Sequence, residues 1–309
     1  MNNNILMYEH PARIWEEGLM LGNGAFGAMV YGGVDHETVQ FNHDTFWSGH
    51  VKRDEELDFP SPKEKLSEAR ELLFDGKYAE ARDMLRTFHS AQAEAYMPLG
   101  FLHINYQDIS GLYYNYKRTL SLDTAVMEVK YGRKCSSLTN SYSSFERQMF
   151  ISKPHDVFVL RIKSMTPRKI CMRLSFDSDV MHSVKTVGND MLFMEGQAPT
   201  HMEPVWNQWF DNTVVYDEKH KSVKFNMLMK VQSSDGFVDA ISDGIRIMGA
   251  SDVTVFVNAQ TSFISFDEDP VKPMNCEAKI NAAIADGYEK ILQTHIKDYQ
   301  SLYNRSSIP

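Results

Sequence analysis

The stretch LGNGAFGAMVYGGV, residues 21 to 34, decides the fold. Its glycines Gly22, Gly24 and Gly27 follow the pattern G-x-G-x-x-G, which is the fingerprint of a dinucleotide-binding turn. A dinucleotide site needs this turn between a strand and a long helix, because the pyrophosphate binds at the helix N-terminus. Here the residues that follow Gly27 read AMVYGGVDHE, with two further glycines and the character of a strand. We therefore interpret the glycines as residues of tight turns and closely packed strands, and we predict no cofactor.

The rest of the sequence is predicted to be mainly β-structure. Alternating polar and apolar residues predict strands at 37–42 (ETVQFN) and 223–231 (VKFNMLMKV), and 156–163 (DVFVLRIK) is typical of a strand buried on both faces. Apolar residues at helical spacing predict a helical hairpin at 62–90 and further helix, in one piece or two, within 276–303. Because many short strands follow one another without helices between them, we expect a large antiparallel β-sandwich.

Composition excludes several classes of partner. The chain has 309 residues and a formal net charge of −9, so its field repels nucleic acid and anionic membrane surfaces. The start lacks the basic and apolar parts of a signal peptide, and no apolar run is long enough to cross a bilayer. We expect a soluble, cytoplasmic protein. Cys135, Cys171 and Cys276 form neither a zinc motif nor a disulfide framework, and we expect them to be buried.

The segment FNHDTFWSGH, residues 41–50, carries the densest group of chemically useful side chains. It follows a predicted strand, where binding groups are often mounted, and Asn42, Asp44 and Trp47 are our main candidates for binding a substrate. Alternatively, Asp44 and Thr45 cap a turn while Phe46 and Trp47 pack into the core. The two histidines of this segment lack a paired second motif, so we predict no metal site.

A second segment, APTHMEPVWNQWF at 198–210, contains two tryptophans whose faces could stack on a sugar ring. Trp206 and Trp209 more often fill a loop or an interface, and His201 is a weaker candidate for the site. Cleavage of a glycosidic bond needs two carboxyl groups with different pKa values, and the sequence alone does not show which carboxyl groups lie close together.

Several segments together resemble one enzyme family. WEEGLMLGNGAFGAMVYGGV followed by VQFNHDTFWSG is similar to the opening of the family-95 glycoside hydrolases, and the likeness continues through YMPLGFLHINY and EGQAPTHMEP to HIKDYQSLYNR. Small departures, such as His43 where the family usually has glutamate, concern local packing. The resemblance therefore covers nearly the whole chain.

The resemblance implies an N-terminal β-sandwich at 1–275, with the hairpin at 62–90 inserted, and a helical linker at 276–309 that leads to an (α/α)6 catalytic barrel. It implies an inverting exo-glycosidase that releases terminal α-L-fucosyl or α-L-galactosyl residues from glycans. The family's catalytic residues, a glutamic acid and an asparagine–aspartate arrangement, lie in the barrel. We therefore expect no catalytic residue in this chain and no activity of this chain alone, with Asn42, Asp44, Trp47 and His201 bordering the sugar pocket.

Two alternatives stay open. In the first alternative, the chain is a free-standing carbohydrate-binding or scaffolding sandwich. In the second, it belongs to a related phosphorylase that acts on disaccharides. The segment NHDTFWSG argues against the phosphorylase.

Overall fold

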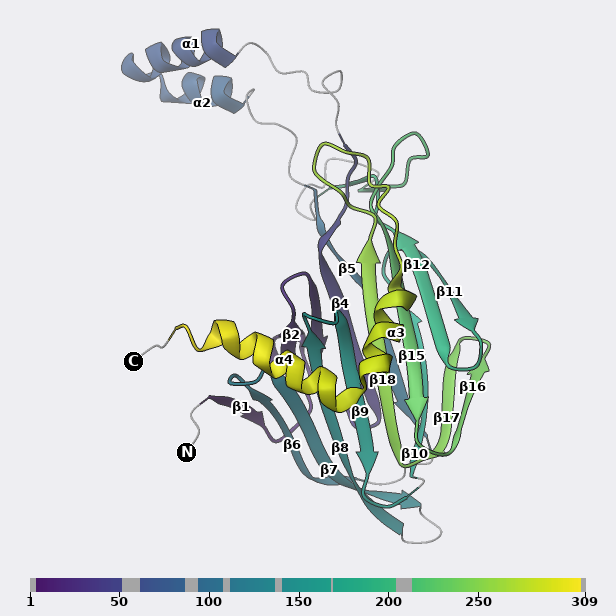
Figure 1. Ribbon diagram of the computed structural model, residues 1–309. Coiled ribbons are helices and arrows are strands. Elements are labelled where there is room, and N and C mark those ends of the chain that lie inside the picture. The colour runs from purple at the N-terminus through teal and green to yellow at the C-terminus, as the bar shows by residue number, and fades with distance from the viewer. Residues whose placement is uncertain are drawn as a thin grey trace.

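The computed structural model describes residues 4–51, 62–86, 94–107, 112–136, 141–167, 169–203 and 213–306. Antiparallel strands dominate it and form two large sheets that face each other (Figure 1). The first sheet has nine strands in the order β1-β6-β7-β8-β9-β18-β15-β12-β11. Their bounds are β1 Ile5–Tyr8, β6 Tyr113–Ser121, β7 Val126–Ser136, β8 Ser141–Ser152, β9 Val157–Ser164, β18 Asp252–Thr261, β15 Lys224–Ser233, β12 Met191–Gln197 and β11 Met181–Val187.

The second sheet has seven strands in the order β16-β17-β10-β5-β4-β3-β2. Their bounds are β16 Phe237–Ile241, β17 Gly244–Ala250, β10 Ile170–Asp177, β5 Tyr96–Tyr106, β4 His36–Trp47, β3 Phe26–Val30 and β2 Leu19–Gly22. A short ribbon pairs β13 (His201–Met202) with β14 (Val214–Val215). The predicted antiparallel β-sandwich is confirmed.

Both predicted helical regions are present. Helices α1 (Pro62–Phe74) and α2 (Tyr78–Arg86) form the inserted hairpin, which stands apart from the two sheets in Figure 1. Helices α3 (Cys276–Asp286) and α4 (Tyr288–Tyr303) follow the last strand, and a 3-10 turn, η1, covers Trp15–Glu17. Gly287, at a φ of 76°, separates α3 from α4. No helix in the described part of the chain has the length and apolarity to span a membrane.

The core lies between the two large sheets. Alternate residues of β15, Phe225, Met227, Met229 and Val231, are buried and point into it, as the alternation in the sequence predicts. Burial of so much apolar surface is the main force that holds the sheets together. The sandwich therefore provides a rigid frame for the loops at its ends.

A second, smaller core lies on the outer face of the nine-stranded sheet, where α3 and α4 cross it (Figure 1). Ile280 and Ile291 of the helices are fully buried there against residues such as Phe150. Strand β9 serves both cores, because Phe158 points into the sandwich and Val159 lies under the helices. The strand predicted to be buried on both faces is confirmed, and the linker role of 276–309 stays a prediction.

The glycines of the opening stretch belong to two consecutive hairpins. Gly24, at a φ of 98°, turns the chain from β2 into β3, and the Asn23 side chain accepts hydrogen bonds from the backbone of Ala25 and Phe26. Gly33 lies in the turn between β3 and β4, where a Cβ atom would lie 1.8 Å from the His36 carbonyl oxygen. No helix follows these turns, so the interpretation as tight turns is confirmed.

Candidate functional site

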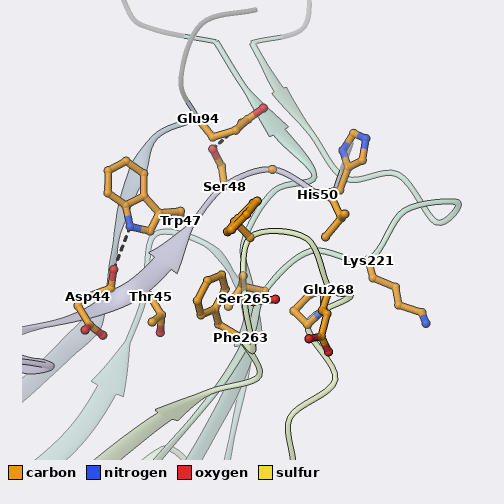
Figure 2. A pocket seen from close by; sticks show the side chains of 15 residues that line it. Asp44, Thr45, Trp47, Ser48, His50, Glu94, Lys221, Phe263, Ser265 and Glu268 are labelled. Atoms are coloured by element: carbon orange, nitrogen blue, oxygen red, sulfur yellow. Dashed lines mark hydrogen bonds between the residues drawn. The ribbon is translucent and has the colours of Figure 1, made fainter. Parts of the chain in front are cut away.

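The segment 41–50 ends β4 at one end of the sandwich. Pairing of β4 with β5 shifts register between Asn42 and Trp47, and such an irregularity re-aims the side chains that follow it. Asp44 and Trp47 there line a pocket of about 220 Å³ (Figure 2). Its other walls come from Glu94, from the segment before β15 and from the loop after β18. Four segments far apart in the sequence therefore meet at this pocket.

Trp47 provides an aromatic wall. Its Nε1 donates a hydrogen bond to the Asp44 carbonyl oxygen at 2.9 Å, which fixes the ring (Figure 2). Trp47 and Tyr96 are each 44% exposed, and their ring centroids lie 5.2 Å apart. Asn42 contacts this pair through a hydrogen bond to the Tyr96 side chain. Phe41 and Phe46 of this segment fill the core and Trp47 does not, so an aromatic surface remains open to a ligand.

Asp44 presents its carboxylate at the rim, with half of its side chain exposed to solvent. The carboxylate lies 2.9 Å from Nδ1 of His43, and this nitrogen is also 2.9 Å from the Thr45 hydroxyl. Burial lowers the pKa of His43 below its ordinary value, although the Asp44 carboxylate opposes this shift. Because half of the Asp44 side chain is exposed, its carboxylate can still accept hydrogen bonds from hydroxyl groups of a ligand.

His201 joins the site through Glu94. Glu94 accepts a hydrogen bond from the Ser48 hydroxyl at 2.8 Å, and its other oxygen lies 2.9 Å from His201 Nδ1. His201 Nε2 lies 2.9 Å from Glu203. The hydrogen bond to Glu94, with that to Glu203, raises the pKa of His201. Burial alone would raise the pKa of Glu94, but hydrogen bonds from His201 and Ser48 hold it below its ordinary value.

The structure thus brings the four predicted residues to one end of the sandwich in different positions. Asp44 and Trp47 line the pocket, Asn42 supports its aromatic wall, and His201 braces Glu94. Their role in binding a substrate stays a prediction. Trp206 and Trp209 lie outside the described residues. Among the described residues, no group of three or more histidine, cysteine, aspartate or glutamate side chains is arranged to hold a metal ion.

Sequence reasoning missed several residues of the pocket. Glu94 precedes β5, and Phe263 and Phe266 belong to the loop after β18. Phe266 is 89% exposed and Glu268 lies beside it in the lining, so the pocket combines apolar and acidic walls. Aromatic faces and carboxylates are the groups that pack on and hydrogen-bond to hydroxylated rings. One available signal was that YMPLGF, which directly follows Glu94 and Ala95, belongs to the family resemblance.

Comparison with known proteins finds similarity to enzymes that act on carbohydrates. The chain is 27% identical over 98% of its length to "Alpha-L-fucosidase 2" of Arabidopsis thaliana and 25% identical over 93% of its length to "Probable alpha-fucosidase A" of Aspergillus niger. It spans only 36% and 35% of these two relatives. A solved structure titled "Putative kojibiose phosphorylase from human microbiome" matches 97% of this chain and 35% of its own, at 13% identity and a TM-score of 0.45.

A family model confirms the recognition of an N-terminal glycoside hydrolase domain, and the two relatives themselves carry fucosidase names. That model describes the N-terminal domain of family 65, whereas the motifs in the sequence resemble family 95. Because the model matches residues 6–265, which is most of the chain, this protein belongs to the family described as "Glycosyl hydrolase family 65, N-terminal domain".

Proposed function

We propose that this chain is the N-terminal domain of an inverting exo-glycosidase that hydrolyses terminal α-L-fucosyl, or α-L-galactosyl, residues of glycans. The catalytic residues lie in an (α/α)6 barrel, which residues 276–309 link to the sandwich at 1–275. This chain alone is then inactive. The names of the two curated relatives support the substrate class, and the family model supports the position of the domain.

One observation carries the placement of the site. Asp44 and Trp47 lie in the same pocket, the tryptophan ring is held open by its hydrogen bond to the backbone, and the carboxylate is exposed beside it. A sugar ring that stacks on Trp47 can donate hydroxyl hydrogens to Asp44. This end of the sandwich borders the sugar pocket of the intact enzyme and contributes to positioning rather than to bond cleavage.

Substitution of Asp44 in the full-length enzyme tests this role. Asp44→Asn keeps the shape of the side chain and removes its charge. We expect kcat/KM on an aryl α-L-fucoside to fall about tenfold or more, because one charge-assisted hydrogen bond to the substrate is lost. Asp239→Asn on the edge strand β16 is the control, because Asp239 is a partly exposed aspartate outside the lining of the pocket, and it should leave kcat/KM unchanged. An unchanged kcat/KM for Asp44→Asn removes Asp44 from the site.

The exposed pair of Trp47 and Tyr96 also favours a second candidate, a carbohydrate-binding sandwich without catalysis. The reaction of the full-length protein with a fucosylated glycan distinguishes the glycosidase from the binding module and from the phosphorylase. Release of free fucose, with inverted anomeric configuration in proton NMR, supports the glycosidase, whereas release that requires inorganic phosphate supports the phosphorylase. Binding of fucosylated glycans by a full-length protein that releases no sugar supports the binding module.

A further inference from the structure

Two further hollows continue, one after the other, from the pocket at Asp44 and Trp47. One has a volume of about 660 Å³ and shares Lys221 and Pro270 with that pocket. The other has a volume of about 520 Å³ and shares Gln197 and Lys224 with the first hollow. Both volumes lie within the range of small-molecule sites, which is about 300–1,000 Å³. The three hollows therefore lie in sequence, from the end of β4 onto the outer face of the nine-stranded sheet.

Strand register builds the floor of this outer part. Met181 of β11 pairs with Gln197 of β12, which pairs with Lys224 of β15, and the next row in the same direction contains Ser183, Glu195 and Asn226. Side chains two residues apart on a strand share a face, so both rows project from the same side of the sheet. We call these six residues, Met181, Ser183, Glu195, Gln197, Lys224 and Asn226, the outer groove.

Helix α3 and the loop before it provide one wall. Met274 lines both hollows, and the Cys276 thiol, at the start of α3, lies 3.3 Å from the Asn226 carbonyl oxygen. Figure 1 shows α3 lying along β15 and β18, with β12 and β11 to one side of it. The groove is thus bounded by the helix and opens toward the edge strand β11.

The polar groups of the outer groove are mostly unused within the described protein. The side chains of Lys224 and Asn226 make no hydrogen bond or ion pair there. The Gln197 amide reaches only the Met181 sulfur at 3.8 Å, and Glu195 accepts from the Ser183 hydroxyl at 3.4 Å. Amides both donate and accept hydrogen bonds, as sugar hydroxyls do. Such a surface can bind a hydroxylated chain without first breaking strong internal contacts.

We propose that the outer groove binds the neutral oligosaccharide chain that continues from the terminal sugar held at Asp44 and Trp47. This inference rests on the proposed function, because it extends that pocket. The two hollows contain lysines and acidic residues in comparable number, Lys221, Lys224 and Lys272 against Asp217, Glu218 and Glu195, which favours a neutral ligand over an anionic one. The groove selects for longer glycans by contacts outside the terminal residue.

Titration of this chain with two probes tests the proposal. The probes are L-fucose and lacto-N-fucopentaose I, a neutral fucosylated pentasaccharide, and the readout is the Kd from ligand-observed NMR. The double variant Gln197→Ala/Asn226→Ala should raise the Kd for the pentasaccharide roughly tenfold, since two hydrogen-bonding amides are lost, and leave the Kd for fucose unchanged. Gln232→Ala is the matched control, because Gln232 is an exposed amide on β15, the strand of Asn226, and lies outside the groove.

Three results overturn the proposal: a pentasaccharide that binds no more tightly than fucose, a double variant with an unchanged Kd for it, or no binding of the pentasaccharide by the unmodified chain. Asp44→Asn separates this proposal from the proposed function. Asp44→Asn should weaken the binding of both probes, whereas the double variant in the groove should weaken the binding of the pentasaccharide alone. If the groove variants act as expected and Asp44→Asn has no effect, the groove stands and the placement of the terminal sugar fails.

Discussion

Removal of the charge of Glu37 should destabilise the sandwich strongly. Glu37 and Arg147 form an ion pair at 3.1 Å inside the core, with their side chains 1% and 0% exposed. Two unit charges at 3.1 Å attract by about 5 kcal/mol at an effective dielectric constant of about 20. Glu37→Gln keeps the shape and leaves the guanidinium of Arg147 buried without its counter-charge. We expect a loss of about 3–5 kcal/mol in the free energy of unfolding, because partial relief of desolvation offsets the lost attraction.

Urea unfolding followed by tryptophan fluorescence measures this loss. Glu277→Gln, an exposed glutamate in the first turn of α3, is the control and should change the free energy by no more than about 0.5 kcal/mol. In a double-mutant cycle with Arg147→Met, the two sites should couple by about 1–3 kcal/mol. A loss below about 1 kcal/mol for Glu37→Gln, or additive effects in the cycle, refutes a stabilising ion pair in the core.

Two other perturbations have clear expected outcomes. Gly33→Ala should lower the free energy of unfolding in urea by more than about 2 kcal/mol, because its Cβ would lie 1.8 Å from the His36 carbonyl oxygen. Gly27→Ala is the control and should lower it by less than about 1 kcal/mol, because the nearest atom to a Cβ at Gly27 is at 3.8 Å. Equal losses for the two variants contradict the close approach at Gly33. The raised pKa of His201 contributes stability that is fully present below its unfolded value of 6.5 and is lost as the pH rises through the higher folded value. His201→Gln should therefore reduce the loss of stability that occurs as the pH rises above about 6.5, by less than about 1 kcal/mol because the ring is partly exposed. An unchanged pH profile contradicts the bridge to Glu94.

Local patterns in the sequence predicted most of the fold. The alternation in β15 and the doubly apolar β9 place the core correctly, because side-chain periodicity is a local property of a strand. Apolar residues at helical spacing in 62–90 predicted the hairpin, and the break at Gly287 shows that the last helical region is two helices. The order of strands was not predictable in this way. β18 pairs with β9 and β15, and such pairing depends on contacts far apart in the sequence.

The candidate site was predictable only where its residues are neighbours in the chain. Asp44 and Trp47 stand in one short segment, and the structure places them in one pocket. Glu94, before β5, and Phe263, after β18, reach that pocket from other parts of the chain. No side-chain pattern around them marks them as site residues, and only the family resemblance of YMPLGF points to the neighbourhood of Glu94. Glu37 shows the same limit, because glutamate is rarely buried, and this one shares the buried face of β4 with Val39 and Phe41 and lies beside an arginine of the opposite sheet.

The outer face of the nine-stranded sheet changes character along a single strand, and this change supports the interpretation of the outer groove. On β15, Lys224 and Asn226 face outward beside the groove, and Leu228, next on the same face, is buried against α3. The apolar part of the face coincides with the helices that cover it. The part of the face that no helix covers carries amides and charges, as a sheet face open to solvent does. These groups can donate and accept hydrogen bonds with hydroxyl groups, which is what the proposed binding of a neutral oligosaccharide requires of the groove floor.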